Sequence, residues 1–256
     1  MNSTIQCPSC LKTTDIAHGV CTCGFQLPQE SMAIIRPIRR QAKIPVAVRI
    51  AIFIDSTGSA APFADGVKMS IKQILEPISK KAKETKVYLF TGGDLDYNQE
   101  CNLICDGVTA EEAIRATQSL TFSGGGDVEE THIDSLETVL KRTPWEVDFR
   151  KYRNALVVFT TADSKPARSG VTPSQLGSSL KQIGISTYLV AEDVPFTQEL
   201  SHASGALYFP ISNNPDPAEM QQIAANISKS ILMAATSSTQ LMPKADRDNN
   251  VIDLEK

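Results

Sequence analysis

The 256-residue sequence contains no apolar run of the roughly 18–20 residues that a membrane-spanning helix needs. Basic residues do not outnumber acidic ones: the net charge is −4, so no overall positive field favours nucleic acid as a partner. The first six residues have neither the basic start nor the apolar core of a secretion signal. We therefore expect a cytoplasmic protein without a membrane segment, whose cysteines are metal ligands or buried thiols and not disulfides.

Histidine is also sparse, and the three histidines stand far apart at positions 18, 132 and 202. No Ser–His or Cys–His pairing for nucleophilic catalysis is evident, and no glycine-rich phosphate loop ends in Gly-Lys-Ser or Gly-Lys-Thr. We interpret His132 and His202 as structural, and His18 as a minor candidate for a zinc ligand. Apart from Asp55, the chain has no evident groups for acid–base or nucleophilic chemistry, and we expect that it is not an enzyme.

Cysteine, in contrast, is concentrated in residues 1–26, where four of the six cysteines form two close pairs: Cys7 with Cys10, and Cys21 with Cys23. Paired thiolates on two turns can meet in a tetrahedron around one Zn²⁺. The spacing Cys-x₂-Cys…Cys-x-Cys-Gly resembles a zinc ribbon. So small a unit cannot be stabilised by core burial alone, so we expect Zn²⁺ to fold it.

Two further segments have no regular pattern. Residues 27–45 contain three prolines and four basic residues, which predicts a basic linker that is either solvated or a docking strip for an acidic partner. Residues 237–256 are polar and aperiodic, which predicts a disordered tail. The remaining cysteines, Cys101 and Cys105, lie four apart near a strand predicted at about 101–107. We expect both to be buried free thiols on one face of that strand.

Strand and helix patterns alternate between residues 46 and 236. Short apolar runs typical of buried parallel strands occur at 46–55, 87–90, 155–159 and 185–191. Helical patterns lie near 62–83, after a capping box at 109–112, at 130–141, from Pro173, and at 196–203 and 217–235. We expect Pro77 to kink or split the first of these helices. The alternation predicts an α/β fold, a doubly wound and mostly parallel sheet with helices on both faces.

Oxygen-rich side chains follow the two most apolar strands. Asp55, Thr57 and Ser59 come directly after strand 46–55, and Asp163 follows strand 155–159. The central strands of such a sheet are the most apolar, so these two strands should be neighbours at the switch point, where the strand order reverses. Ligands bind there, beyond the carboxyl ends of the strands. A glycine-rich loop ending in Asp127 has the flexibility to fold over this edge. Hard oxygen ligands suit Mg²⁺ or Mn²⁺, so we expect these five side chains to surround one divalent cation.

This constellation resembles the von Willebrand factor A (vWA) domain with its metal-ion-dependent adhesion site (MIDAS). The first element matches the family's Asp-x-Ser-x-Ser, with Thr57 in place of the middle serine. The glycine-rich element resembles the Gly-Gly-Gly-Asp-x-Pro-Glu subgroup, in which an Asp stands in the position of a Thr, and here Glu129 replaces the Pro. The third element looks like a Thr-Asp-Ala-Pro-Pro turn, but Ala162 separates Thr161 from Asp163.

The resemblance covers about residues 46–236 and implies metal-dependent protein–protein recognition. In that family a divalent cation with an open coordination position binds an Asp or Glu of a protein partner, and the zinc ribbon would be a second docking surface. The combination is similar to bacterial adaptors of the TerY type in stress and tellurite-resistance systems, whose partners would be a kinase, a phosphatase or an AAA+ ATPase. The extra carboxylate of Asp127 is expected to let the site hold its metal without a partner.

Two other functions stay open. The stretch from Asp55 to Ser59 also looks like the Asp-x-Thr-Gly-Thr motif of haloacid dehalogenases and P-type ATPases, in which the Asp forms an aspartyl phosphate with Mg²⁺. Lys165 could correspond to the lysine of a later motif in that class. However, no acidic pair that could hold Mg²⁺ follows it, and Asp127 has no role in that mechanism. Alternatively the zinc unit binds nucleic acid, although Lys12 is the only basic residue in 1–26.

Each predicted carboxylate ligand also has a purely structural interpretation. Asp55 and Asp127 can cap the helices that follow them, and Asp163 can serve as a turn residue before Pro166. The loop Gly92-Gly93-Asp94 is either a strand-end turn or a second loop near the metal.

Overall fold

The computed structural model describes residues 4–6, 13–15, 23, 46–212 and 214–236. The chain divides into two units, Met1–Lys43 and Ile44–Lys256. In the first unit, β1 (Thr4–Gln6) pairs with β2 (Thr13–Asp15) in antiparallel fashion. Three predicted zinc ligands lie outside the described residues, as do the linker 27–45 and the tail 237–256, and Cys23 is an exposed turn residue. The ribbon thus remains a prediction.

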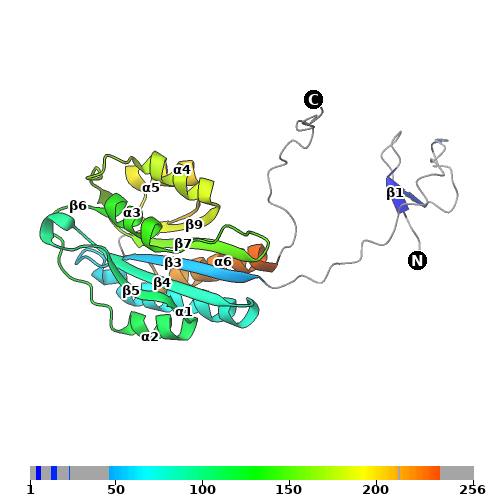
Figure 1. Ribbon diagram of the computed structural model, residues 1–256, viewed down its shortest axis with the longest axis horizontal. Helices are drawn as coiled ribbons and strands as arrows, with labels where there is room; N and C mark the ends of the chain where they lie inside the picture. The colour runs from blue at the N-terminus through cyan, green and yellow to red at the C-terminus, as the bar shows by residue number, and fades with distance from the viewer. Residues whose placement is uncertain (1–3, 7–12, 16–22, 24–45, 213, 237–256) are drawn as a thin grey trace, which may run out of the picture. The chain divides into compact units, whose positions relative to one another are not determined.

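A six-stranded sheet in the order β10-β9-β7-β3-β4-β5 forms the centre of the second unit (Figure 1). All neighbouring strands are parallel except β5, which pairs antiparallel with β4 at one edge. The two most apolar strands, β3 and β7, are adjacent, as predicted, and the chain leaves β3 for β4 on one side and later returns to β7 on the other. The strands are β3 (Ala47–Asp55), β4 (Thr85–Gly92), β5 (Asn102–Val108), β7 (Tyr152–Thr160), β9 (Ile185–Ala191) and β10 (Leu207–Pro210).

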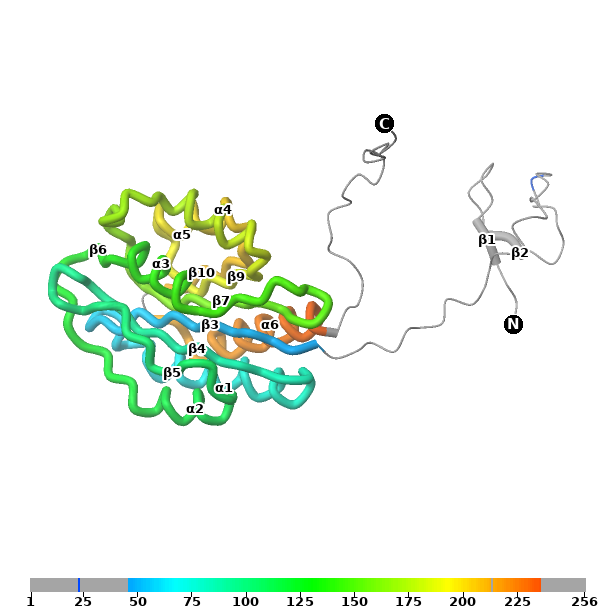
Figure 2. The backbone as a smooth tube through the Cα atoms, in the orientation of Figure 1, coloured from blue at the N-terminus to red at the C-terminus, as the bar shows by residue number. Residues whose placement is uncertain are grey.

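Helices cover both faces of this sheet, which confirms the predicted doubly wound class (Figures 1 and 2). One face and its core lie under α1, α2 and α6, and the other face has a separate core under α3, α4 and α5. The capping box predicted at 109–112 begins α2, where Thr109 and Glu112 hydrogen-bond reciprocally. The helices are α1 (Ala64–Lys81), α2 (Ala110–Gln118), α3 (His132–Arg142), α4 (Pro173–Ile183), α5 (Pro195–Ser204) and α6 (Pro217–Thr236).

The alternation of side chains along β3 decides where the last residue of the strand points. Ile52 packs in the core under α1, α2 and α6, whereas Phe53 packs in the core under α3, α4 and α5. Successive side chains of a strand point to opposite faces, so Asp55 lies on the same face as Phe53, toward α3. The register pairs Ile54 with Phe159, which places Thr160 of β7 beside Asp55 at the carboxyl edge.

Two local predictions differ from the structure. Of the two outcomes predicted for Pro77, the split does not occur, because α1 continues as one helix through Pro77; apolar residues on both sides of the proline, Ile74 and Ile78, are fully buried and hold the helix in place. Cys101 and Cys105 pack against opposite cores and not on one face. The reason is a bulge: Leu89 of β4 faces Cys105, but the next residue, Phe90, faces Leu103, so the side-chain alternation of β5 shifts by one.

Short elements complete the carboxyl edge. Two-residue strands β6 (Glu129–Glu130) and β8 (Asp163–Ser164) pair in parallel, and the 3₁₀ turns η3 (Ala61–Phe63) and η4 (Leu95–Tyr97) follow β3 and β4. Among the described residues, no helix combines the length and the apolar character that crossing a membrane requires.

Candidate metal site

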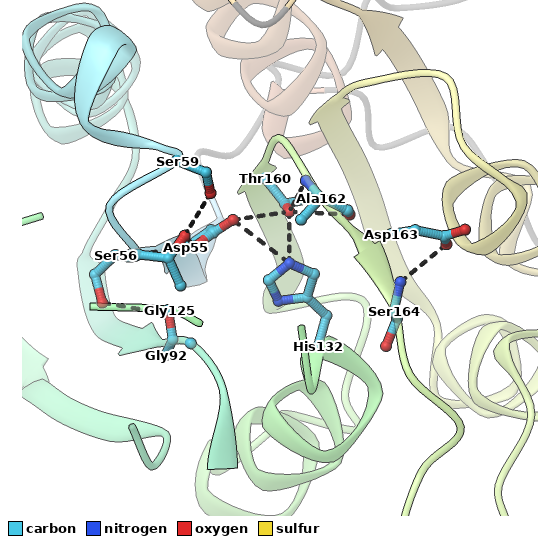
Figure 3. Close-up of polar contacts among 12 residues, drawn as sticks. Asp55, Ser56, Ser59, Gly92, Gly125, His132, Thr160, Ala162, Asp163 and Ser164 are labelled. Atoms are coloured by element: carbon cyan, nitrogen blue, oxygen red, sulfur yellow. Dashed lines mark hydrogen bonds and ion pairs between the residues drawn. The ribbon is translucent and has the colours of Figure 1, made fainter. Parts of the chain in front are cut away.

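Asp55 is fully buried at the carboxyl end of β3, and both of its oxygens accept hydrogen bonds (Figure 3). Oδ1 accepts from the backbone N–H and the hydroxyl of Thr57, at 3.0 and 2.7 Å. Oδ2 accepts from the Thr160 hydroxyl at 3.2 Å and lies 3.5 Å from Nε2 of His132. Burial alone would raise the pKa of Asp55, but His132 and Thr57 outweigh burial and hold the pKa below its usual value. Asp55 is therefore a carboxylate at neutral pH.

The hydroxyls of Thr57 and Ser59 extend this group of oxygens. Thr57 Oγ1 lies 2.9 Å from Ser59 Oγ, and Thr57 is fully buried. Asp55, Thr57 and Ser59 thus form a continuous line of oxygens along the loop that joins β3 to α1. Three of the five predicted Mg²⁺ ligands are brought together in this loop.

His132, the first residue of α3, contacts the Asp55 carboxylate. Its ring is fully buried and lies edge-on to Phe53, at 5.8 Å between ring centroids. Nε2 lies 2.7 Å from Thr160 Oγ1, whose proton is directed at Asp55, so we assign the imidazole as the donor in this contact. The sequence interpretation of His132 as structural therefore misses a positioning role: the ring fixes Thr160 and Asp55 together.

The glycine-rich loop folds over the same edge, as predicted. Its backbone pairs with the β3–α1 loop through Ser123 N–H to Ser56 O and Gly58 N–H to Gly124 O, at 2.9 and 3.0 Å. Gly125 has a φ of +77°, and a Cβ there would lie 3.1 Å from Glu130 Oε1 and 3.4 Å from Thr57 Cβ. The positive φ favours glycine at this point, and a Cβ there would be in tight contact with the Glu130 carboxylate.

Asp127 lines the same cleft as Ser59, and its carboxylate is ion-paired. Its carboxylate lies 2.9 Å from the ammonium of Lys165, which also contacts Asp94 at 2.6 Å and Asp96 at 2.8 Å. We call Lys165 with its three carboxylates the lysine cluster. Asp94 is fully buried; burial would raise its pKa, but the hydrogen bonds from Lys165 and from the Asp96 N–H, together with the charge of Lys165, outweigh burial and lower it.

Asp163 accepts a hydrogen bond from the first turn of α5. One carboxylate oxygen accepts the backbone N–H of Ser164 at 2.9 Å and that of Phe196, in the first turn of α5, at 3.1 Å. In Figure 3 its side chain points away from Asp55 and His132. Thr160 is the residue that lies beside Asp55, and the three residues beyond it carry the chain past the edge of the sheet into β8. In this arrangement the Asp163 carboxylate is engaged by β8 and α5 and faces away from Asp55.

Replacing Asp163 with alanine is expected to destabilise the domain by about 1 kcal/mol, measured by urea denaturation. The residue that precedes α5 is Val194, which has no side-chain oxygen, so Asp163 is the acceptor that satisfies an N–H of the first turn. Affinity for divalent cations is expected to stay unchanged, and a loss of metal binding at unchanged stability would contradict this assignment.

Glu130, at the final Glu of the Gly-Gly-Gly-Asp-x-Pro-Glu pattern, is a buried acid that is not among the five predicted ligands. The residue is only 1% exposed, and its Oε2 has no hydrogen-bond partner among the described residues. Burial, followed by the nearby charge of Asp55, raises the pKa of Glu130 to about 7. The hydroxyl of Thr161 is likewise buried without a partner in the described part of the chain. Both oxygens belong to residue types that can ligate a hard cation.

A cleft of about 700 Å³ opens beside these oxygens. Ser59 and Thr161 line it from the two central strand ends, and Asp127 with Val128 lines it from the glycine-rich loop. Val128 is 86% exposed. Of Asp55, Thr57 and Ser59, Ser59 is the residue that lines this cleft and is exposed, next to an apolar side chain on a loop.

The donor set fits a hard divalent cation with few carboxylate ligands. In the described ranges, no three His, Cys, Asp or Glu side chains are grouped closely enough to form a cage by themselves. A cation here would depend on one or two carboxylates, on hydroxyls and on water, which is how Mg²⁺ is usually bound. The residues that would hold it are Asp55, Thr57 and Ser59, and the two unpartnered buried oxygens of Glu130 and Thr161 are available beside them.

Comparison with known proteins gives the fold a name. No family profile and no curated protein matches the sequence. Among solved structures, the VWA domain of SpRpn10 aligns with a TM-score of 0.52 at 12% identity, over 70% of this chain and 94% of that one. Proximal thread matrix protein 1 (PTMP1) from the mussel byssus, in a form with a zinc-occupied MIDAS motif, aligns with a TM-score of 0.57 at 14% identity, over 75% of this chain and 47% of PTMP1. The domain has a vWA fold.

At these identities the likeness establishes the fold alone. Within that fold, the site residues that sequence reasoning missed are Thr160, His132 and Glu130. The strand register would have found Thr160, since it is the residue opposite Asp55 on a neighbouring parallel strand. Glu130 stands at the final Glu of the Gly-Gly-Gly-Asp-x-Pro-Glu pattern, which could have marked it, whereas His132 carries no comparable signal.

Proposed function

We propose that this vWA domain is a metal-dependent protein-binding module. The observation that supports it is the line of oxygens formed by Asp55, Thr57 and Ser59 at the carboxyl end of the central strand, next to an open cleft. A bound divalent cation would offer an open coordination position to a carboxylate oxygen of a partner protein. Mg²⁺ or Mn²⁺ suits these donors, while the zinc-occupied MIDAS motif of PTMP1 makes Zn²⁺ the competitor to test.

The chain's own residues define the chemistry of such a site. Thr160 and His132 hold Asp55 in one orientation, so the carboxylate needs no rearrangement to face a cation. The backbone pairing of the glycine-rich loop fixes the loop beside Thr57 and Ser59. Val128, at the mouth of the cleft, offers apolar contact to whatever residue flanks the partner's Asp or Glu.

We infer a binding role and not an enzymatic one. The lysine that an aspartyl-phosphate mechanism would place near Asp55 is instead within 3 Å of Asp94, Asp96 and Asp127. This arrangement supports the binding module over the phosphohydrolase alternative.

The N-terminal unit and the biological setting belong to the same proposal. We propose that Cys7, Cys10, Cys21 and Cys23 bind Zn²⁺ in a ribbon and offer a second docking surface. The pairing of β1 with β2, which flank the Cys7–Cys10 segment in sequence, is compatible with this. The resemblance to TerY-type adaptors points to a cytoplasmic bacterial stress system, with a kinase, a phosphatase or an AAA+ ATPase as the partner.

The test uses Asp55→Asn, which removes the charge and keeps the shape of a fully buried side chain. We expect the full-length wild type to bind Mg²⁺ or Mn²⁺ in calorimetry and to capture a partner from source lysate in a Mg²⁺-dependent way, and Asp55→Asn to lose both. Asp65→Asn, which neutralises an exposed acid in the first turn of α1, is the matched control. A chelator alone cannot decide, because it would also remove ribbon zinc. A partner that Asp55→Asn still captures would move the function to the ribbon or the linker.

A further inference from the structure

A second cleft, of about 350 Å³, lies beside the loops of the metal site but is lined by none of the five predicted ligands. It is bordered by the end of β4, the start of β5 and the segment that follows α2. Ser56 lines it from the β3–α1 loop, and in Figure 3 its hydroxyl points toward Gly92 and away from the Asp55 carboxylate. The cleft is therefore a separate concave site, and its volume lies at the lower end of the range of ligand pockets.

The lining of this cleft is rich in oxygen and carries one charge. Hydroxyl and amide side chains make up most of it, and Glu100 is the one lining residue with a charged side chain. Glu100 is exposed and forms no ion pair with a lysine or arginine of the described ranges. No lysine, arginine or histidine from the described part of the chain lines the cleft, so its charge is negative.

The carboxyl end of α2 adds to this negative character. α2 ends at Gln118, and the Ser119 N–H bonds back to the carbonyls of Ala116 and Thr117. The carbonyls of Ser119 and Leu120, two lining residues, accept no hydrogen bond from the residues that the structure describes. Carbonyls at the carboxyl end of a helix carry partial negative charge and take their donors from solvent or from a ligand. A positively charged donor group is therefore the ligand that this end of the cleft favours.

The wall between this cleft and the glycine-rich loop is fixed by the side chain of Gln99. Its Oε1 accepts the N–H groups of Gly125 and Asp94, at 2.9 and 3.3 Å, and its Nε2 donates to Ser123 O at 2.7 Å. The two clefts share this anchored loop, since Ser123 lines one of them and Asp127 lines the cleft beside the metal site. A single partner surface can therefore contact both clefts.

We propose that this cleft binds a guanidinium group, supplied by an arginine of the protein that the metal site binds. The choice of partner rests on the proposed function, whereas the guanidinium chemistry does not. A guanidinium has five N–H donors and no acceptor, which matches a carboxylate surrounded by carbonyl, hydroxyl and amide oxygens. Glu100 supplies the opposite charge, and Ile104 and Leu120 offer apolar contact to the aliphatic stem. A lysine ammonium has three donors and is more strongly hydrated, so it fits this lining less well.

This assignment specifies the surface that a partner must present. A carboxylate for the metal and a guanidinium for the Glu100 cleft would contact neighbouring sites that share the glycine-rich loop. A metal ion alone accepts any accessible Asp or Glu, so the guanidinium contact would distinguish one acidic partner from another.

The experiment titrates the isotope-labelled full-length protein with n-butylguanidinium and follows the amide chemical shifts by NMR. We expect the amides of residues 99–104 and 119–123 to shift in a saturable way, and neutral n-butylurea, of similar shape, to have no such effect. Glu100→Gln removes the charge at the cleft and is expected to weaken n-butylguanidinium binding by roughly fivefold. Glu111→Gln, which neutralises an exposed acid in the first turn of α2 outside the cleft, is the matched control and should bind as the wild type does.

The outcomes separate this inference from the function on which its partner rests. Equal shifts with n-butylurea, or unchanged affinity in Glu100→Gln, would overturn the inference and leave the metal site untouched. Asp55→Asn should still bind n-butylguanidinium, because Asp55 does not line the cleft. If that variant loses divalent cations but keeps guanidinium binding, both proposals are supported independently. Guanidinium binding by a wild type that binds no divalent cation would overturn the proposed function and keep the guanidinium site.

Discussion

Replacing Lys165 with methionine is expected to lower the melting temperature of the domain by several degrees, one of the two largest stability changes that we predict. The Lys165 ammonium is the common partner of the carboxylates of Asp94, Asp96 and Asp127, and methionine keeps much of its apolar stem. Removing it leaves the fully buried Asp94 without its cation, and leaving a buried charge unpaired is among the most destabilising kinds of single substitution. Differential scanning fluorimetry at neutral pH measures the change.

The lysine cluster also fixes the loops of the metal site. Asp94 and Asp96 lie in the loop after β4, Asp127 ends the glycine-rich loop, and Lys165 follows β8, so one ammonium joins three segments. We therefore expect the amides of residues 124–128 to exchange with deuterium faster in Lys165→Met. Millimolar Mg²⁺ or Ca²⁺ should restore part of the stability of this variant, because the metal ion can bind among the three carboxylates in place of the missing Lys165 ammonium.

Arg168→Met is the matched control for this prediction. Arg168 pairs with Asp96 at 3.1 Å, but both side chains are more than half exposed, and such surface pairs contribute little. We expect no change in melting temperature or in loop exchange for this variant. Equal effects of the two substitutions would show that general surface charge, and not the lysine cluster, determines the stability of this edge.

The fold could be predicted in detail because its determinants are local. The buried strands β3 and β7 are nearly unbroken apolar runs, and helices α2 and α4 begin with capping residues that the sequence displays. The two-residue strands β6 and β8 could not be predicted, since two residues have no periodicity. The antiparallel bulge in β5 was equally hidden, and it is why Cys101 and Cys105 face different cores.

The site could be predicted only where its residues are close in sequence. Asp55, Thr57 and Ser59 lie at alternate positions of one loop, so their contacts follow from the motif. The partners of Asp127 and Asp163 are Lys165 and the first turn of α5, both more than 30 residues away, and no motif records those pairings. Glu130 stands at the final Glu of the glycine-rich pattern, but glutamate is rarely buried, so its burial could not be expected from its residue type.

Replacing Glu130 with glutamine is expected to stabilise the metal-free protein by roughly 1–3 kcal/mol at and above neutral pH. Burial and the charge of Asp55 raise the pKa of Glu130 from about 4.5 to about 7, so its ionised form is disfavoured in the folded state. The two pKa values set an upper limit of roughly 3 kcal/mol, and the glutamine N–H groups, which also need partners, reduce the gain.

The sign of the pH dependence follows from the raised pKa. A protonated Glu130 favours folding below about pH 4.5, and this contribution is lost as the pH rises through about 7. Glutamine does not titrate, so the stability of Glu130→Gln relative to the wild type should increase across that window. Urea denaturation in a chelator, at several pH values, measures it, and Glu129→Gln, with its exposed side chain, should parallel the wild type.

Adding Mg²⁺ should reverse the order of the two proteins. A ligand that binds the folded state stabilises it in proportion to its affinity, so the wild type should gain stability with Mg²⁺ and Glu130→Gln should gain little. A residue that weakens the empty protein and strengthens the loaded one is retained for its ligand, because a structural role would predict destabilisation on substitution in both conditions. If Glu130→Gln were less stable than the wild type even in chelator, Glu130 would be a structural residue with a partner still to be found.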